Sequence, residues 1–255
     1  MRSRWILLLE AGAAVLFLGL LALLAARVVR SSPDPGDVPW LLLAAAAGYA
    51  LADVASGLTH WFCDTFFEET TPGIGPVLIH PFRQHHRDPA AMTRHGFLEL
   101  TGNSCLGVAP VMGLALWRSW SEILDAGVIA FALALFATNL FHKWAHSERV
   151  PRPVAWLQKC RLILNPSQHA VHHAPPNTSA YCVTNGWMNP LMDRILGRKE
   201  SIVPAVPAER LTTWEESNGL ILPPRPVSAR ERTENIQSRA GRAPERGPAA
   251  GRPSP

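Results

Sequence analysis

Four long apolar runs, separated by polar or charged segments, dominate the pattern of this 255-residue chain. They cover residues 5–26, 40–58, 105–117 and 123–141. A helix needs about 20 mostly apolar residues to cross the hydrocarbon core of a bilayer. The third run is short for a span and contains Pro110, whereas the other three have about the required length. The pattern therefore predicts an all-α integral membrane bundle of about four transmembrane helices.

The first run has two possible roles. Arg2 and Arg4 precede it, and Arg27 and Arg30 follow it, as expected for a membrane span. Its small residues also fit a cleavage site, so a cleaved signal peptide is the alternative interpretation. We favour a retained transmembrane helix, because the run is longer than a typical signal core and further spans follow it.

Changes in composition divide the chain into three parts. Residues 1–39 hold the first apolar run and a loop that contains three prolines and a glycine. Residues 40–222 hold the other three runs and all ten histidines. Residues 223–255 are rich in Pro, Arg, Gly, Ser and Glu and show no apolar periodicity, so we predict that this tail is disordered.

Composition and charge support a membrane protein. Apolar residues make up 47% of the chain and charged residues 17%, against about 25% charged in a typical soluble domain. The net charge of +4 comes mainly from the tail and from the loops between apolar runs, which fits membrane topology better than nucleic-acid binding. The cysteines are too widely spaced for a disulfide framework or a Cys-x-x-Cys metal site: Cys63, Cys105, Cys160 and Cys182.

The histidines are expected to share one side of the membrane. If four helices cross, the N-terminus, the long loop 60–104 and everything after residue 141 lie together, and all ten histidines with them. Arg27, Arg30 and Arg118 lie on the opposite side. The histidine side holds many more basic residues, so the positive-inside rule predicts that it is cytoplasmic. Those residues are Arg2, Arg4, Arg83, Arg87, Arg94, Lys143, Arg149, Arg152, Lys159 and Arg161.

Two acidic residues accompany the second apolar run. Asp53 lies within it, and an acid at membrane depth is usually functional or paired. His60 and Asp64 follow at a spacing of four, which places both on one face of a helix. On its own this pair is weak, because a histidine at a helix end is more often a cap or a hydrogen-bonded core residue than a metal ligand.

The polar segment after the second run holds a second histidine group. His85 and His86 are adjacent and would point in different directions on a helix, so they can serve two metal ions or one ion and a neighbouring group. His95 follows. Asp88 and Glu99 are candidates to accept the remaining imidazole N–H groups. A polar loop beside the membrane is the alternative interpretation.

Two further elements follow the last apolar run. His142 and His146 are four residues apart, but Lys143 stands where a zinc protease needs glutamate, so hydrolysis by that mechanism is disfavoured. His169, His172 and His173 place three imidazoles within five residues, which is the most specific element of the set. Together the motifs supply more imidazoles than one zinc or haem needs, and two metal ions are the natural count.

The setting favours redox chemistry on a lipid. Imidazole binds several transition metals, so the ligand type does not select iron. The chain has no dinucleotide-binding, P-loop or cysteine-cluster motif of its own. A metal pair at the bilayer surface beneath apolar helices is well placed to receive an alkyl or acyl chain, and removing hydrogen from an unactivated C–H bond requires oxygen activated by a redox metal.

Several motifs resemble the lipid desaturase domain of the plasmanylethanolamine desaturase family, which includes a bacterial carotenoid-regulating homologue. The resemblance extends over about residues 53–198, with the motifs in the same order and at similar spacing. The motifs are Pro81-Phe-Arg-Gln-His85-His86-Arg-Asp88-Pro89 with Thr93-Arg94-His95, His142-Lys-Trp-Ala-His146-Ser147, His169-Ala-Val-His172-His173 and Tyr181-Cys-Val-Thr-Asn-Gly-Trp187.

This resemblance implies an oxygen-dependent enzyme with two histidine-bound irons, which converts the alkyl ether of a plasmanyl phospholipid into the vinyl ether of a plasmalogen. Electrons would come from an external cytochrome b5-like or ferredoxin-type carrier. Plant proteins with a similar domain desaturate an acyl chain of phosphatidylglycerol, so the lipid substrate stays open. The expected location is a bacterial inner membrane, with several spans and a cytoplasmic active site.

Carried over by position, the resemblance implies a set of iron ligands and their neighbours. His80 precedes the Pro-Phe-Arg motif and is expected to be peripheral. Asp64 matches an acid of the family, and Asn185 is expected near the site. The implied ligands are His60, His85, His86, His95, His142, His146, His169, His172 and His173.

Three other functions stay open on the sequence. An acyl-lipid desaturase would use the same metals on a different chain. A lipid hydroxylase would use the same oxidant but return oxygen to the carbon, which a gain of mass would reveal. A membrane protein that binds metal or haem for signalling would need only paired histidines on facing helices.

Overall fold

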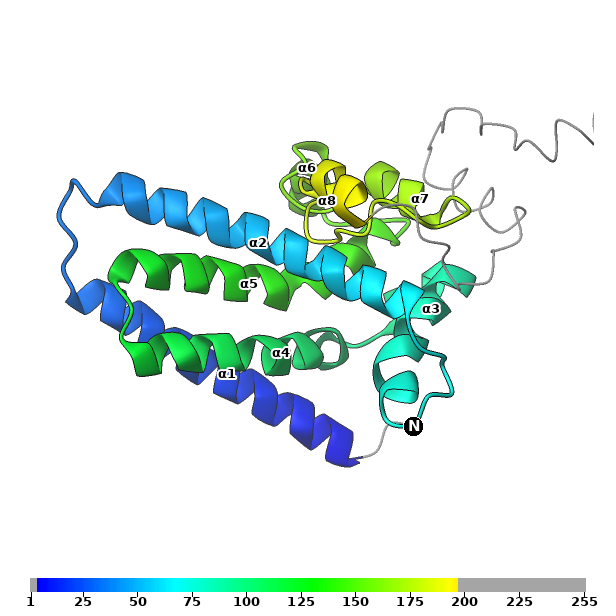
Figure 1. The fold of residues 1–255 in the computed structure, drawn as a ribbon, viewed down its shortest axis with the longest axis horizontal. Helices are drawn as coiled ribbons and strands as arrows, with labels where there is room; N and C mark the ends of the chain where they lie inside the picture. Colours follow the sequence, from blue (N-terminus) through cyan, green and yellow to red (C-terminus); the bar gives the residue numbers. More distant parts are fainter. Residues whose placement is uncertain (1–3, 197–255) are drawn as a thin grey trace, which may run out of the picture. The chain divides into compact units, whose positions relative to one another are not determined.

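The computed structural model describes residues 4–196, and every regular element in that range is a helix (Figure 1). Four helices are long, and the others are short segments that follow the second and fourth of them. The predicted tail at residues 223–255 lies outside the described residues. The elements are α1 (Arg4–Arg30), α2 (Val38–Thr65), η1 (Gly75–Ile79), α3 (His80–Arg87), η2 (Pro89–Arg94), α4 (Phe97–Arg118), α5 (Glu122–Ala145), α6 (Arg152–Lys159), α7 (Pro166–His173) and α8 (Asn189–Leu196).

The prediction of an all-α bundle with four candidate membrane spans is confirmed. Helices α1, α2, α4 and α5 are each long and apolar enough to cross a bilayer. Only 17% of the most apolar stretch of α1, and 39% of that of α4, is buried against the rest of the protein. A helix that is apolar on its outward side needs an apolar solvent. The chain is therefore built as a multi-pass membrane protein.

The structure corrects the boundaries of the third span. Helix α4 begins at Phe97, eight residues before the predicted run, and continues through Pro110 to Arg118. Glu99 reaches back to the backbone N–H of Gly96, which caps the first turn. The segment expected to be a loop also contains η1, α3 and η2. Apolar run length missed α3 because its buried side chains are polar, namely Arg83, His85 and His86, and it missed η1 and η2 because they have only five and six residues.

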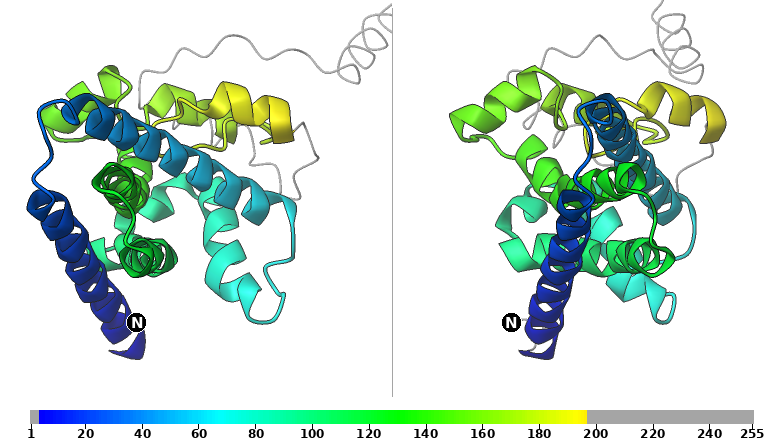
Figure 2. Two further views of the ribbon diagram at one scale, coloured as in Figure 1. Left: turned by 60° about the vertical axis from the view of Figure 1, so that its left-hand side comes forward. Right: turned by 90° about the vertical axis from the view of Figure 1, so that its left-hand side faces the viewer.

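Helices α4 and α5 lie between α1 and α2 (Figure 2). Apolar side chains from α1, α4 and α5 form one core cluster, in which the rings of Phe17 and Phe136 stack with centroids 5.1 Å apart. At the end of the bundle away from the histidines, Arg27 of α1 pairs with the buried carboxylate of Asp125 on α5 and donates to the Ala115 carbonyl. These contacts close that end.

Helices α2 and α5 approach each other through glycine. A Cβ atom added to Gly48 would lie 2.1 Å from the carbonyl oxygen of Gly127, and one added to Gly127 would lie 3.1 Å from that of Ala44. Small residues of this kind let two membrane helices pack backbone to backbone. The close crossing fixes α2 against α5, and His60 and His142 lie on these two helices nearer the other end.

We predict that Gly48→Ala lowers the free energy of unfolding by about 1–3 kcal/mol, because the added methyl group overlaps the α5 backbone. Thermal and denaturant unfolding of the purified protein in detergent measure this change. The matched control is Gly19→Ala, where nothing lies within 4 Å of the added carbon and stability should stay equal or rise slightly. Equal stability of the two variants would contradict the close crossing.

Candidate metal centre

Eight of the ten histidines converge in the interior at one end of the bundle. They come from helix α2, helix α3, the end of α5 and helix α7, which are far apart in the sequence. All eight are buried. They form two groups that share His85. The first group is His85, His142, His146, His169 and His173, and the second is His60, His85, His86 and His172.

Local structure explains how the short helices present their imidazoles. The Asn165 side chain accepts the backbone N–H of Ser167 and caps α7, and Pro166 fills its first turn. On α3, the buried Arg83 donates to the carbonyls of Cys63 and Phe66 at the end of α2, at 3.2 and 3.0 Å. These bonds hold the histidines of α3 beside His60.

In the first group, four Nε2 atoms point at a common centre. His169 Nε2 lies 2.8 Å from His142 Nε2, 2.8 Å from His146 Nε2 and 3.0 Å from His173 Nε2. Two imidazole nitrogens bound to one metal ion at about 2.0–2.1 Å would be roughly 2.9–3.4 Å apart. The spacing of these nitrogens therefore matches shared coordination of one cation.

Hydrogen bonding alone does not satisfy this arrangement. A neutral imidazole nitrogen has one in-plane site, which holds either a hydrogen or a lone pair. His169 Nε2 can thus bond to one of its three neighbours, while His142 Nε2 and His146 Nε2 also face each other at 3.2 Å. A cation accepts every lone pair at once. The donor set and its geometry fit a transition-metal ion.

A carboxylate lies among the histidines of the second group. The Oδ2 atom of Asp64 lies 3.1 Å from His86 Nε2 and 3.3 Å from His172 Nε2, and it is 3.5 Å from His60 Nε2. The sequence placed Asp64 on one helix face with His60, and the resemblance matched it to an acid of the family. In the structure its oxygen stands among the inward-facing nitrogens, where a further ligand atom would be.

Two backbone carbonyls fix which ring nitrogen carries hydrogen in this group. His60 Nδ1 lies 3.2 Å from the Tyr181 carbonyl oxygen, and His172 Nδ1 lies 2.8 Å from that of Ser179. A carbonyl accepts only, so both Nδ1 atoms carry the hydrogen. The Nε2 atoms of His60 and His172 then direct lone pairs at the Asp64 carboxylate, an arrangement that needs a cation between them.

Burial keeps the imidazoles outside the membrane spans uncharged. It lowers the pKa of His85, His169 and His173 well below the usual value, and neighbouring histidines add to the effect. Burial likewise lowers the pKa of His146 to about 3. His85 Nε2 is also buried without a hydrogen-bond partner among the described residues. Neutral imidazole is the form that binds a metal, so the group is ready for a cation at neutral pH.

The remaining predicted residues lie elsewhere. His95 is outside both groups and contacts Glu99, with 3.3 Å between Nδ1 and the carboxylate. The Asp88 carboxylate pairs with Arg94 on the surface, at 2.8 Å.

His80, expected to be peripheral, pairs with Glu69 outside both groups. Asn185 is buried, and its side-chain oxygen accepts the backbone N–H of Trp187 at 2.8 Å. It therefore belongs to a loop near the second group and not to the set of converging nitrogens.

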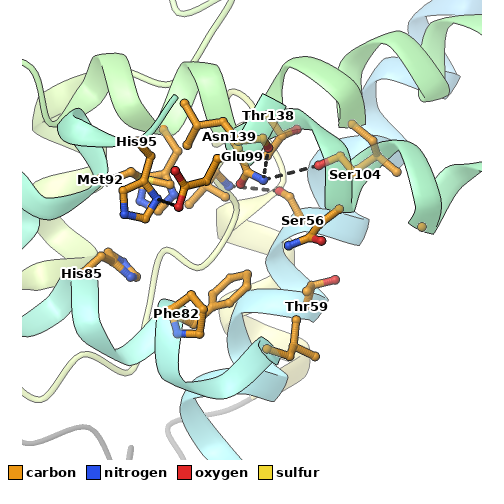
Figure 3. Close-up of a pocket in the computed structure, with 18 of the residues that line it drawn as sticks. Ser56, Thr59, Phe82, His85, Met92, His95, Glu99, Ser104, Thr138 and Asn139 are labelled. Carbon is orange, nitrogen blue, oxygen red and sulfur yellow. Dashed lines mark hydrogen bonds and ion pairs between the residues drawn. The ribbon is translucent and has the colours of Figure 1, made fainter. Parts of the chain in front are cut away.

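A pocket of about 510 Å³ opens from the histidines into the bundle (Figure 3). His85 and His142, which belong to the metal groups, form part of its wall, and His95 and Glu99 lie on the same side. Farther along, its lining is mostly apolar. The apolar part is formed by residues of α4 and α5, among them Gly107, Val111, Phe131 and Leu135.

Sequence reasoning missed the outer contacts of the site. The carbonyls of Ser179 and Tyr181 carry no sequence signal, because every residue has a carbonyl. Arg83 was counted only as a positive charge, although it is buried and caps α2. Asp53 gave a usable signal as an acid within an apolar run.

We predict that the metal-free protein loses stability as the pH falls from 7 toward 5. Unfolded histidines bind protons near pH 6.5, whereas folded His146 resists protonation until about pH 3. The unfolded state therefore gains protons first, and stability falls by up to about 1.4 kcal/mol per pH unit for each such group. Chelator-treated protein melted in detergent at several pH values tests this. H146N should flatten the slope, while a melting temperature that rises on acidification would refute the burial argument.

Comparisons with known proteins agree with this geometry. Residues 49–206 match the family model described as the lipid desaturase domain. The plasmanylethanolamine desaturase of Myxococcus xanthus is 40% identical over 198 residues, covering 74% of this chain and 66% of that protein. Plasmanylethanolamine desaturase 1 of Mus musculus is 37% identical over 161 residues, or 59% of each chain. The chloroplastic fatty acid desaturase 4 of Arabidopsis thaliana is 33% identical over 184 residues, covering 69% of this chain and 55% of the relative.

The chain thus spans between 55% and 66% of the length of these three relatives. No solved structure matches it. The domain match covers more than half of the chain, and all eight converging histidines lie within it. This chain belongs to the lipid desaturase domain family.

Proposed function

We propose that this chain is an oxygen-dependent lipid desaturase that converts the alkyl ether of a plasmanylethanolamine into the vinyl ether of a plasmenylethanolamine. The observation that carries the proposal is a long, mostly apolar pocket whose wall at one end contains His85 and His142 of the metal groups. Such a pocket delivers a hydrocarbon chain to the site where a metal would be held.

The two histidine groups would hold two iron ions, one in each group, with His85 as a ligand to one of them and Asp64 as an oxygen ligand. Iron supplies the ability to activate O₂ for the removal of hydrogen from an unactivated C–H bond. The role of the chain is to hold the neutral imidazoles in place, to exclude water by burial and to position the lipid. We assign His95 to the pocket wall with Glu99, because the two groups form without it.

The reaction balances with two external electrons. One alkyl CH₂–CH₂ unit, O₂, two electrons and two protons give one CH=CH unit and two molecules of water. We propose that a separate small carrier, cytochrome b5-like or ferredoxin-type, brings the electrons to the histidine side. The excess of basic residues on this side supports a cytoplasmic location under the positive-inside rule.

The shape of the pocket supports a reaction near the headgroup end of the chain. From His142 to Phe131 the lining follows α5 for eleven residues, which at 1.5 Å per residue is about 16 Å. A chain that enters at the histidines would lie with most of its length in this apolar part. Its reacting carbons would then be close to the headgroup, as they are in an alkyl ether next to its oxygen.

An acyl-lipid desaturase is the second candidate. The relative named fatty acid desaturase 4 supports it at 33% identity, whereas the two relatives named plasmanylethanolamine desaturases are at 40% and 37%. The same pocket would also accept an acyl chain whose reacting carbons lie near the carboxyl group. Identity therefore favours the ether lipid, and the product distinguishes the two.

We predict that a plasmalogen-free bacterial host expressing the chain, supplied with plasmanyl lipid and air, accumulates acid-labile vinyl ether lipid two hydrogens lighter than its precursor. Lipid mass spectrometry measures it. His169→Ala should abolish the product because it removes the nitrogen at the centre of the first group. His80→Ala is the matched control and should keep activity, since His80 lies outside both groups.

Different products would redirect the proposal. A new double bond in acyl chains, with no vinyl ether, would support the second candidate. A product heavier by one oxygen would indicate a hydroxylase. No product from the intact chain, with iron present and electrons available, would refute a lipid oxidase of any of these kinds.

We also predict that Gly107→Phe shifts the preferred substrate toward shorter chains. Gly107 lines the apolar part of the pocket, and an added Cβ meets nothing within 4 Å, so the ring can enter the space of the chain. Gly113→Phe, on the same helix and equally uncrowded but not in the pocket lining, is the control. Chain-length profiles of the product test this. Identical profiles for both variants would mean that the lipid chain does not lie in this part of the pocket.

A further inference from the structure

The segment between α7 and α8 is held by its own backbone N–H groups. It forms no regular element, yet from Cys182 to Met188 every backbone N–H donates to a side-chain oxygen. The acceptors lie on α2, on α8 and within the segment. Cys182 donates to Asn189, Val183 donates to Ser56, and Trp187 donates to Asn185. The other four donors share Asp53 as their acceptor: Thr184, Asn185, Gly186 and Met188.

Asp53 accepts four of these seven bonds. Its Oδ1 receives the N–H groups of Thr184, Asn185 and Gly186 at 3.1, 2.9 and 3.0 Å. Its Oδ2 receives that of Met188 at 3.0 Å. The carboxylate is fully buried in the middle of α2, a position that costs much free energy unless its charge is met by such donors. The acid noticed within the second apolar run is thus the anchor of a loop.

The segment also contacts α2 directly, on the helix face that carries Asp53. Ser56, one turn after Asp53, accepts the N–H of Val183 at 3.1 Å. At Gly57 an added Cβ would lie 2.5 Å from Cys182 Sγ and 3.3 Å from its backbone. His60 follows a turn later on this face. The anchor and the histidine therefore share one rigid helix.

The anchored segment fixes the orientation of two imidazoles of the second group. Its Tyr181 carbonyl accepts the Nδ1 hydrogen of His60, and the Ser179 carbonyl, two residues earlier, accepts that of His172. Each bond fixes the ring orientation and directs the Nε2 lone pair inward. Partners behind a metal-bound histidine commonly change metal affinity by about 10–100-fold.

We propose that Asp53 is a positioning residue for the second metal site. By holding the segment 182–188 on α2, it fixes the positions of the Tyr181 and Ser179 carbonyls. These carbonyls in turn fix the tautomer and orientation of His60 and His172. This role rests on the proposed function, because it concerns the site that would hold the second iron. Among the described residues, the only histidines that donate to these carbonyls are His60 and His172, which are not in the first group, so an ion held by that group would not depend on Asp53.

Asp53→Asn is the direct test. Asn keeps one oxygen for the three N–H groups at Oδ1, but its NH₂ group would face the N–H of Met188, where two donors oppose each other. The control is Asp125→Asn, a carboxylate that is equally buried but pairs with Arg27 at the far end of the bundle. Cobalt(II) titration of the chelator-treated, full-length protein in detergent reports stoichiometry, affinity and ligand-field spectrum without catalysis.

We expect the wild type and Asp125→Asn to bind two cobalt ions. Asp53→Asn should keep one tight ion and bind the second about 10–100-fold more weakly, with a changed spectrum for that ion. In the lipid assay kcat should fall more than KM changes, because Val183 is the one residue of the anchored segment in the pocket lining. Ser56→Ala, which removes one acceptor, should weaken the second ion in the same direction by less.

The outcomes separate this role from the proposed function. Two tightly bound ions with the wild-type spectrum in Asp53→Asn would overturn the positioning role. If Asp53→Asn fails to fold, unaltered second-ion affinity in Ser56→Ala overturns it instead. A wild type that binds no metal would count against the proposed function, whatever the variants show.

Discussion

Neutral imidazoles repel one another at hydrogen-bond distance when each directs a lone pair at the same point, and the rest of this structure depends on how that repulsion is relieved. His169 Nε2 has three such neighbours within 3.0 Å. Helices α3 and α7 have eight residues each, too short to be stable alone, and both carry imidazoles that face this centre. A cation at the centre would turn repulsion into the bond that holds them.

The two ends of the bundle serve different purposes. At the far end, the Arg27–Asp125 pair and the Gly48–Gly127 crossing bring the long helices into close contact. At the histidine end lies the pocket, whose lining comes from α2, α4 and α5 together with the short elements η1, α3 and η2. Tight packing at one end therefore allows a cavity at the other without loss of a defined fold, because backbones that touch at glycine leave little freedom to slide.

The sequence was sufficient for the local features and insufficient for the long-range ones. Apolar run length predicted four spans, because the bilayer imposes a minimum length on each. Spacing within a motif placed His142 with His146 correctly, since a helix has a fixed repeat. It did not reveal that His85 belongs to both groups while His95 belongs to neither, because this depends on how α3 packs beside α2. The carbonyls behind His60 and His172 were equally hidden, since only the folded loop brings them there.

The same geometry bears on the haem alternative that the sequence left open. A haem iron takes its axial ligands from opposite faces of a flat macrocycle, so two histidines that bind it must stand on opposite sides of the ring with the ring between them. Here the facing Nε2 atoms are 2.8–3.2 Å apart, and every ligand atom of a group lies within 4.8 Å of the others. No flat macrocycle fits between nitrogens that close. Single ions would fit there, and His85, which belongs to both groups, sets the two groups side by side. A reaction that takes two hydrogens from adjacent carbons needs this proximity, since both carbons must reach the oxidant without the lipid leaving its pocket.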